Sequence, residues 1–455
     1  MTETALDDAY RLLHEAEITL DGRPVGVLAA VDPRWRRDNY RQCFVRDFVP
    51  AALVHLANGS TDIVRNFLDT VIEARGLARD MAEHQVQPGV MPASFWVAED
   101  SDGSQRLRAD FGDRAIGRVA PVDAMMWWTI LLCAYVRHTG DAELARTPRY
   151  QQSLRMILTL CLQGSFEIFP TLLVPEGAFM IDRRMGVDGH PLEIQALFYA
   201  TLECAHTLCE PADDEDRALL ERAARRQSAL RSYVRSYYWL DLPRLDQIHR
   251  FTDEDFDDAQ TNIFNIHPHS VPLWLSDWVP DDSGYLAGNV GPALIDYRFF
   301  AQGNLLSILF GLASDDQAHR ILNLFEARWD DLIGAVPLKI CFPALDDGEW
   351  KAITGADPKN RPWSYHNGGN WPVLLWPFVA AALKSGRREL ADRAVESAHK
   401  RVPQDKWPEY YDGRHGRLTG HRAHFNQVWS ATALILAHQM LDDPSILQLL
   451  PGHSA

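Results

Sequence analysis

One acidic residue, Asp182, stands in surroundings that suit proton donation. It follows the apolar stretch GAFMI and precedes Arg183 and Arg184. Partial burial raises the pKa of a carboxyl group toward the range of a general acid, whereas neighbouring cations lower it. An acid role for Asp182 therefore requires the two arginines to point elsewhere or to be engaged by other carboxylates. The alternative interpretation is a salt-bridged surface loop, which is the common setting for such a charge run.

A second candidate, Glu409, lies between Pro408 and the pair Tyr410-Tyr411 in the stretch WPEYYD. Glycoside hydrolysis needs two carboxyl groups across the scissile bond, one protonated to donate to the leaving oxygen and one ionised to activate water or attack the sugar. Asp182 and Glu409 are the candidates for such a pair. Taken alone, Glu409 is as easily interpreted as a solvated loop residue.

Aromatic, carboxylate and amide side chains accompany these two residues in the polar segments of the chain. Flat apolar faces suit the C–H-rich faces of sugar rings, and carboxylates and amides bind vicinal hydroxyls, so the combination is typical of a carbohydrate site. The residues concerned are Tyr40, Trp127, Trp128, Trp363, Tyr365, Trp371, Trp407, Tyr410 and Tyr411, with Asp47, Asp123, Asp188, Glu193, Asp296, Asp412, His190, Gln195, His366, Asn367 and Asn370.

Six segments of the chain share the pattern that must position these residues. In each, a loop rich in aromatic, carboxylate and Gly/Pro residues leads into a strongly apolar helix, and a more charged, one-sided helix follows. We expect the apolar helices within 39–58, 110–141, 192–209, 289–313, 363–386 and 407–441, and the one-sided helices at 63–75, 151–162, 214–238, 317–332, 389–401 and 6–17.

Helices that are apolar nearly all round are buried, whereas one-sided helices lie outside them. The pattern therefore predicts an all-α (α/α)6 toroid, formed by a single domain over residues 1–455, with a small β-hairpin excursion at 93–109 whose Asp-Gly suits a turn. The loops that lead into the inner helices would open on one face and gather the polar segments around one funnel. An irregular helical bundle is the alternative.

Composition narrows the classes of partner. The formal net charge of −17 disfavours nucleic acid and anionic membranes, because both need a basic surface. The start of the chain lacks the features of a signal peptide and no apolar run reaches 18 residues, so a cytoplasmic location is expected. The six cysteines are scattered and without metal-ligand spacing, which indicates reduced structural thiols and no metal site. No nucleotide-binding glycine motif is present, and no G-x-S-x-G marks a serine nucleophile.

Several of these motifs also have explanations that need no ligand. YHNGGNWP can be a glycine-supported turn before a helix that starts near Trp371. One of two adjacent helical residues must face inward, so Trp127 and Trp128 fit a core better than a platform. His190 can simply cap or turn the chain before Pro191. The coincidence of all six polar segments in equivalent positions outweighs these explanations.

The motifs resemble those of the alkaline/neutral invertases, glycoside hydrolase family 100, which cleave sucrose to glucose and fructose. The similar stretches follow the family's order from 44 to 420, most of the chain. They are FVRDFVPAAL, AIGRVAPVDAMMWW, MIDRRMGVDGHPLEIQALFY, DYRFFAQGNLLSI, WDDLIGAVPLKICFPAL, DPKNRPWSYHNGGNWPVLLW and WPEYYDGRHGRLTG.

The resemblance implies an (α/α)6 barrel, inversion of configuration, no metal or organic cofactor, and a homo-oligomer. It implies that Asp182 is the general acid, which protonates the fructosyl oxygen, and that Glu409 is the general base. The expected contacts of the disaccharide substrate are Tyr40, Arg46, Asp47, Asp123, Trp128, Arg183, His190, Gln195, Tyr365, His366, Trp371, Tyr410 and His424.

One departure from the family pattern concerns the substrate. The family usually shows an Arg near position 424, whereas this chain has His424 in HRAHFNQ, and Arg422 has a different helical phase. If that arginine contacts fructose, the change favours another α-glucoside as substrate. A sugar epimerase on the same ring, which would need histidine bases, and a sugar-sensing protein without turnover are the further alternatives.

Overall fold

The computed structural model describes most of the chain, and everything below concerns these residues. They are 2–33, 39–77, 86–112, 120–163, 169–174, 177–181, 183–187, 189–240, 272, 274–290 and 295–452.

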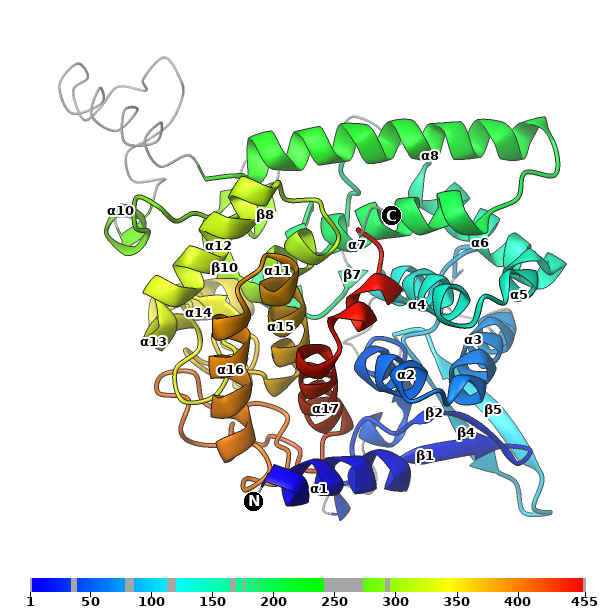
Figure 1. The fold of residues 1–455 in the computed structure, drawn as a ribbon, viewed down its shortest axis with the longest axis horizontal. Helices are drawn as coiled ribbons and strands as arrows, with labels where there is room; N and C mark the ends of the chain where they lie inside the picture. Colours follow the sequence, from blue (N-terminus) through cyan, green and yellow to red (C-terminus); the bar gives the residue numbers. More distant parts are fainter. Residues whose placement is uncertain are drawn as a thin grey trace.

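Six helices form an inner ring in which each packs on the next and the last packs on the first (Figure 1). They are α2 (Phe48–Ala57), α4 (Asp123–Thr139), α7 (Leu192–Leu208), α11 (Ala301–Leu309), α15 (Leu375–Lys384) and α17 (Val428–Asp442). Every residue of α11 is buried, and so are the first nine residues of α2. Helices that are covered on all sides need apolar residues all round, which these sequences supply.

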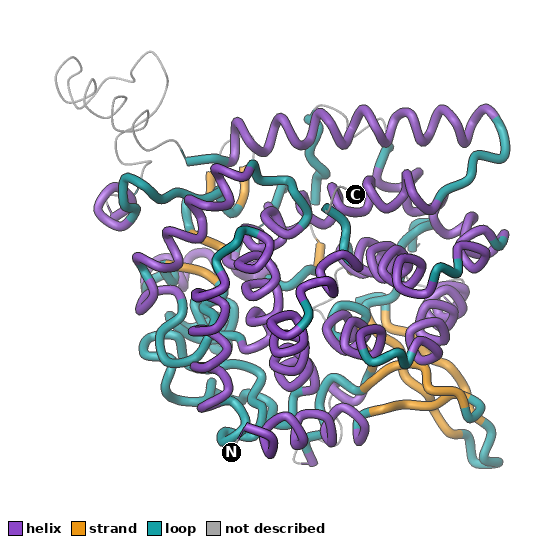
Figure 2. Tube along the Cα trace, viewed as in Figure 1, coloured by secondary structure: helices purple, strands orange, loops and turns teal. Residues whose placement is uncertain are grey.

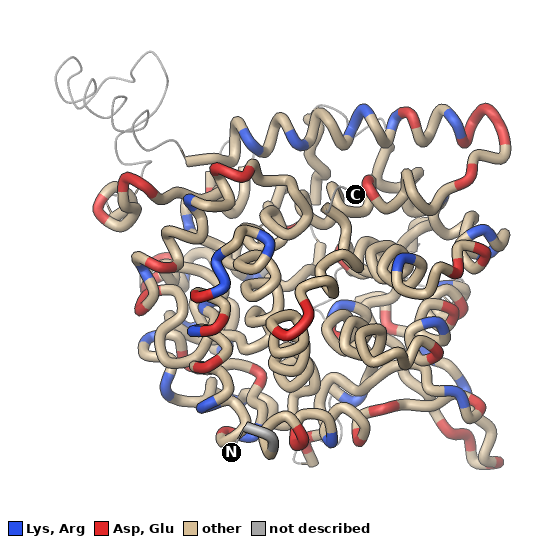
Figure 3. The backbone as a smooth tube through the Cα atoms, in the orientation of Figure 1, with Lys and Arg blue, Asp and Glu red and all other residues tan. Residues whose placement is uncertain are grey.

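Six further helices cover the ring from outside: α1 (Thr2–Glu15), α3 (Thr61–Gly76), α6 (Pro148–Cys161), α8 (Asp214–Tyr233), α12 (Asp315–Ala327) and α16 (Arg388–Arg401). Each has one buried face, and their charged residues lie on the outside of the molecule (Figure 3). Side-chain caps begin two of them, because Asp213 accepts from Asp216 N and Ser314 forms a capping box with Gln317. The predicted (α/α)6 ring is confirmed, with α1 as its sixth outer helix.

Short strands lie mainly in the loops between helices (Figure 2). The expected hairpin consists of β4 (Ser94–Glu99) and β5 (Gln105–Asp110), to which β3 (Cys43–Phe44) adds a third strand. A second hairpin follows α1, formed by β1 (Glu17–Leu20) and β2 (Arg23–Val27). The remaining strands pair two residues each: β6 (Ala120–Pro121) with β7 (Gly177–Ala178), β8 (Asn289–Val290) with β9 (Ile295–Asp296), and β10 (Phe299–Phe300) with β11 (Cys341–Phe342).

Shorter helical segments complete the description: α5 (Ala142–Arg146), α10 (Trp274–Trp278), α13 (Trp329–Leu332), α14 (Asp347–Thr354), the π-helical turn Val234–Tyr238, and 3₁₀ turns at Asn39–Arg41, Arg183–Met185, Pro372–Leu374 and Pro444–Leu449. The six cysteines form no disulfide bond. Within the described ranges, no helix combines the length and apolarity that crossing a membrane requires.

Candidate active site

The loops that lead into α2, α4 and α7 place three carboxyl groups around one arginine. Nη1 of Arg46 donates to Oδ2 of Asp123 at 2.6 Å, and Nε of Arg46 lies 3.8 Å from Oδ1 of Asp47. Glu193, in the first turn of α7, interacts electrostatically with both Arg46 and Asp123. Asp123 and Glu193 are buried, whereas Arg46 and Asp47 remain partly accessible. The inner part of the cluster is therefore buried, and its outer edge, formed by Arg46 and Asp47, is accessible.

Burial controls the charge of this cluster. It raises the pKa of Asp47 to about 7, against the opposing effect of Arg46 and with further upward contributions from Glu409 and Asp123. It raises the pKa of Glu193 to about 8, and Asp123 adds to this while Arg46 opposes it. Because one arginine cannot neutralise three carboxylates, protons remain on some of them near neutral pH. The group can both accept and donate hydrogen bonds to hydroxyls.

Glu409 is fixed in the loop that precedes α17. The Tyr40 hydroxyl donates to Oε1 of Glu409, and the backbone N–H of His424 lies 3.4 Å from Oε2. The Tyr40 ring stacks on His424, with centroids 3.6 Å apart. The backbone N–H of Glu409 donates to the His424 carbonyl at 2.8 Å, and this hydrogen bond joins the two ends of the segment 409–424. The carboxylate is 1% exposed and close enough to Asp47 for their charges to interact. Glu409 therefore lies beside the carboxyl cluster, held by donors to both oxygens.

Aromatic rings form one wall beside Glu409. The Tyr365 ring stacks on His366 with centroids 4.0 Å apart and meets the edge of Tyr410 at 5.4 Å. Trp371 stacks on Tyr410 at 5.5 Å and is 1% exposed, so it supports the wall from behind. Tyr365 remains partly accessible. The site thus combines one open ring with buried rings that hold it in place.

The loop 365–372, which carries Tyr365, depends on glycine and on amide side chains. A Cβ on Gly369 would lie 2.6 Å from the Tyr365 carbonyl oxygen and 3.0 Å from the Tyr410 ring, so only glycine fits there. The Asn367 amide donates to the Leu345 carbonyl at 3.2 Å and accepts from Leu345 N at 2.7 Å. YHNGGNWP is therefore the turn expected before a helix, and the same turn presents Tyr365 to the site.

Lys359 belongs to this site, although our sequence analysis did not select it. Its Nζ lies 3.7 Å from the centroid of the Tyr365 ring, and the neighbouring Tyr365 and Glu409 raise its pKa despite burial. Lys359 lies in the stretch DPKNRPWSYHNGGNWP, which is part of a motif that the sequence analysis identified. A lysine inside such a motif is the feature that could have pointed to it.

Three residues that were predicted as substrate contacts lie apart from this group: Trp128, Gln195 and His190. Trp128 is fully buried, donates from Nε1 to the Leu68 carbonyl at 3.1 Å and stacks on Tyr150, which places it in the core between α4 and the outer helices. Gln195 uses its amide on the backbone of Leu172, accepting at 2.7 Å and donating at 3.0 Å. The sugar contact predicted for Trp128 does not fit this position, and Gln195 fits a role in holding the 169–174 loop.

His190 is buried beside that same loop. Its Nδ1 lies 2.9 Å from the Thr171 hydroxyl oxygen, and burial lowers its pKa. The backbone N–H of His190 donates to Asn289 and its carbonyl accepts from the Tyr238 hydroxyl. These bonds tie the turn before α7 to its neighbours, so His190 supports the entrance of α7.

The predicted general acid, Asp182, lies outside the residues that the structure describes. Asp182 and Asp188 are not among the described residues, and neither is the side chain of Arg183. Arg184 forms an ion pair with the buried Asp357 at 3.0 Å. One of the two cations beside Asp182 is therefore engaged by another carboxylate, which is a condition that an acid role requires.

Comparisons with known proteins agree with this architecture. The family model described as alkaline and neutral invertase matches residues 9–444. Cytosolic invertase 1 of Oryza sativa subsp. japonica is 48% identical over 445 residues, which covers 97% of this chain and 79% of that protein. Alkaline/neutral invertase CINV2 of Arabidopsis thaliana is 47% identical, covering 97% of this chain and 80% of that protein.

Solved glycosidases share the fold at much lower identity. A bacterial glucoamylase complexed with acarbose matches with a TM-score of 0.58 and 13% identity over 97% of this chain and 57% of that chain. A wild-type glycosidase matches with a TM-score of 0.55 and 16% identity over 99% and 98% of the two chains. Because the family model matches residues 9–444 and the two plant relatives are 48% and 47% identical over 97% of the chain, the chain belongs to the alkaline and neutral invertase family and is a glycoside hydrolase.

Proposed function

We propose that this enzyme hydrolyses sucrose to glucose and fructose with inversion of configuration. The observation that carries the proposal is the position of Glu409, a buried carboxylate held by the Tyr40 hydroxyl and the His424 N–H beside the Arg46 cluster. The printed names of the relatives, which describe invertases, support the choice of sucrose.

In the proposed reaction, Glu409 takes a proton from a water molecule while that water attacks the anomeric carbon of the glucosyl unit. Asp182 gives its proton to the fructosyl oxygen as the glycosidic bond breaks. The water attacks from the face opposite the leaving group, so the product is β-glucose. Donors on both oxygens of Glu409 keep the carboxylate oriented, which is what a positioned base requires. An inverting pair needs about 6.5–9.5 Å between the two carboxyl groups.

We assign the sugar contacts by accessibility. Tyr40, Arg46, Asp47, Lys359 and Tyr365 are partly accessible members of the site, so they can touch the disaccharide. His366, Trp371, Tyr410, Asp123 and His424 are buried around them, and the first three keep the Tyr365 ring in place. Deep placement of the glucosyl unit would set its hydroxyls on the carboxylates.

Substitution of the two carboxylates tests the residue roles. We expect Asp182→Asn and Glu409→Gln each to lower kcat by about 10²–10⁴-fold, the range that general acid–base catalysis supplies. Glu389→Gln, on the exposed face of α16, is the control and should keep full activity. Full activity in either active-site variant would refute the corresponding role.

The alternative is hydrolysis of another α-glucoside, favoured by His424 where the family usually shows arginine. Rates on sucrose, trehalose and maltose separate the two proposals. A higher kcat/KM on trehalose or maltose than on sucrose would establish the alternative.

Location and assembly are further proposals. We propose a cytoplasmic enzyme made of one domain that forms a homo-oligomer. The names of the relatives include cytosolic, mitochondrial and chloroplastic forms. Light scattering of the purified chain measures the assembly, and a monomer mass near 51.5 kDa would contradict the oligomer.

A further inference from the structure

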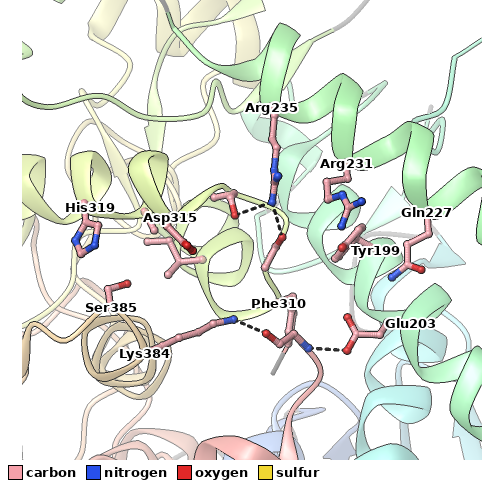
Figure 4. Close-up of a pocket in the computed structure, with 15 residues that line it drawn as sticks. Tyr199, Glu203, Gln227, Arg231, Arg235, Phe310, Asp315, His319, Lys384 and Ser385 are labelled. Carbon is pink, nitrogen blue, oxygen red and sulfur yellow. Dashed lines mark hydrogen bonds between the residues drawn. The ribbon is translucent and has the colours of Figure 1, made fainter. Parts of the chain in front are cut away.

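A pocket lies at the end of the ring remote from Glu409, between the middle of α7, the carboxyl ends of α11 and α15, the start of α12 and the side of α8 (Figure 4). Its volume is about 770 Å³, within the roughly 300–1,000 Å³ of typical small-molecule sites. Glu203, which lines it, lies ten residues along α7 from Glu193, or about 15 Å at 1.5 Å per residue. The pocket is therefore separate from the site described above.

Three cations line this pocket, and two of them are engaged by the protein. Nζ of Lys384 donates to the carbonyls of Leu309 and Gly452 at 2.7 and 2.8 Å. Arg235 donates to the carbonyls that follow α11, including Leu312 at 2.8 Å. These bonds satisfy the carbonyls that a helix end leaves unpaired. The two cations thus build the wall of the pocket.

The third cation, Arg231, remains available. Arg235 follows about one turn later, in the π-helical turn after α8, and in Figure 4 the Arg231 guanidinium points into the pocket. Within the described part of the chain, the Arg231 side chain forms no hydrogen bond or ion pair. Burial lowers the pKa of Arg235 and the like charge of Arg231 lowers it further, whereas Tyr199 and the carboxylate of Asp315 oppose this effect. Because the two guanidinium groups repel each other, an anion bound at Arg231 would relieve the repulsion.

Further polar groups line the pocket with Arg231, and two of them, Glu203 and Asp315, are carboxylates. Tyr199 is 5% exposed, and its hydroxyl makes no hydrogen bond to any described residue. The Gln227 amide and the Ser385 hydroxyl also face the pocket, and neither has a side-chain partner in the described ranges (Figure 4). Glu203 accepts from Gly452 N at 2.7 Å, its Oε1 lies 3.9 Å from Nη2 of Arg137, and it keeps lone pairs for further donors. Such groups bind hydroxyls, whereas a simple inorganic anion would leave them unused.

We propose that this pocket binds a phosphorylated monosaccharide, with its phosphate on Arg231 and its hydroxyls on Glu203, Gln227 and Ser385. Guanidinium groups bind phosphate through paired, charge-assisted hydrogen bonds. The remaining groups supply acceptors and donors for a polyol, and the volume holds a ligand of this size.

Isothermal titration calorimetry of the purified enzyme tests this site with glucose 6-phosphate, inorganic phosphate and glucose as probes. We expect saturable binding of glucose 6-phosphate, at least 10-fold tighter than that of either other probe. The variant Arg231→Gln should weaken this binding by at least 10-fold, because it removes the phosphate contact. The matched control is Arg225→Gln, an exposed arginine of α8 that does not line the pocket, and it should bind as the native chain does.

Each other outcome overturns part or all of the assignment. Absence of binding overturns the site, and binding that Arg231→Gln leaves unchanged places the ligand elsewhere, including at Glu409. Equal affinity for inorganic phosphate overturns the sugar assignment. These results are independent of sucrose hydrolysis, because the measurement is of binding and not of turnover.

Discussion

Replacement of Glu193 by glutamine should stabilise the protein, and increasingly so as the pH rises. The Glu193 carboxyl is 4% exposed, Oε1 accepts from Met180 N at 3.1 Å, and Oε2 has no partner among the described residues. Its pKa is raised from 4.5 to about 8. The folded protein therefore holds a proton between these pH values that the unfolded chain releases, so stability falls as pH rises through this window. Glutamine keeps the bond to Met180 N and removes the titration.

The size of the effect follows from the shift. At about 1.4 kcal/mol per pKa unit, a shift of this size corresponds to about 5 kcal/mol above pH 8. Coupling to Arg46 and Asp123 reduces what one substitution recovers, so we expect about 2–4 kcal/mol at pH 9 and less than about 1 kcal/mol at pH 5. The unfolding entropy of a 455-residue chain is about 1 kcal/mol per degree, so the Tm of Glu193→Gln should exceed that of the native protein by about 2–4 °C at pH 9.

Differential scanning calorimetry at pH 5, 7 and 9 measures this trend. Glu389→Gln is the matched control, because Glu389 is also the second residue of its helix and is exposed. Its Tm difference from the native protein should not grow with pH. A Tm difference between Glu193→Gln and the native protein that is constant with pH would contradict this reasoning, and so would a lower Tm of the variant at pH 9. Either result would mean that the pKa of Glu193 is not raised in the folded protein.

Three further substitutions test the site. Tyr40→Phe removes the hydroxyl that donates to Glu409 and should lower kcat by about 10–100-fold, since hydrogen bonds to charged groups contribute about 1.5–3 kcal/mol; a loss of kcat below twofold would contradict the proposed orientation of the base. Lys359→Met removes the cation over the Tyr365 ring and should raise KM by about 2–5-fold, from about 0.5–1 kcal/mol; an unchanged KM in steady-state assays would remove Lys359 from substrate binding. Gly369→Ala forces Cβ against the Tyr365 carbonyl and should lower both activity and Tm, whereas Gly76→Ala, with open space around it, should do neither; equal behaviour of the two glycine variants would show that the wall tolerates the displacement.

The sequence predicted the ring because its inner and outer helices differ in kind. Buried helices such as α11 are covered on all sides and so lack a polar face, and this feature can be read without knowledge of the partner elements. The two-residue strands could not be predicted, because pairs such as β10 with β11 depend on residues about 40 positions apart. In the structure, β8, β9 and β10 lie in the part of segment 289–313 that the sequence assigns to the loop before the apolar helix.

The site could be predicted only in part. Motifs located Glu409, Asp47 and Tyr365, since each lies in a loop that leads into an inner helix. The contact of Lys359 with the Tyr365 ring depends on how a long loop folds back, which no local pattern specifies. Trp128 was predicted as a substrate contact from its sequence neighbourhood alone. In the structure, Trp127 packs against Phe310 and Trp376, whereas Trp128 packs against Tyr150 of the outer helix α6. Helical phase predicts such a division but does not show which side holds a ligand.

The stereochemistry of sucrose hydrolysis tests the central claim most directly. Proton NMR of the enzyme mixed with sucrose at neutral pH follows the anomeric signals from the first minutes, before mutarotation mixes them. An acid at Asp182 and a base at Glu409 across one water predict β-glucose as the first product. Initial α-glucose would mean retention through a covalent intermediate and would contradict the role of Glu409 as a base, and no glucose release would contradict sucrose as the substrate.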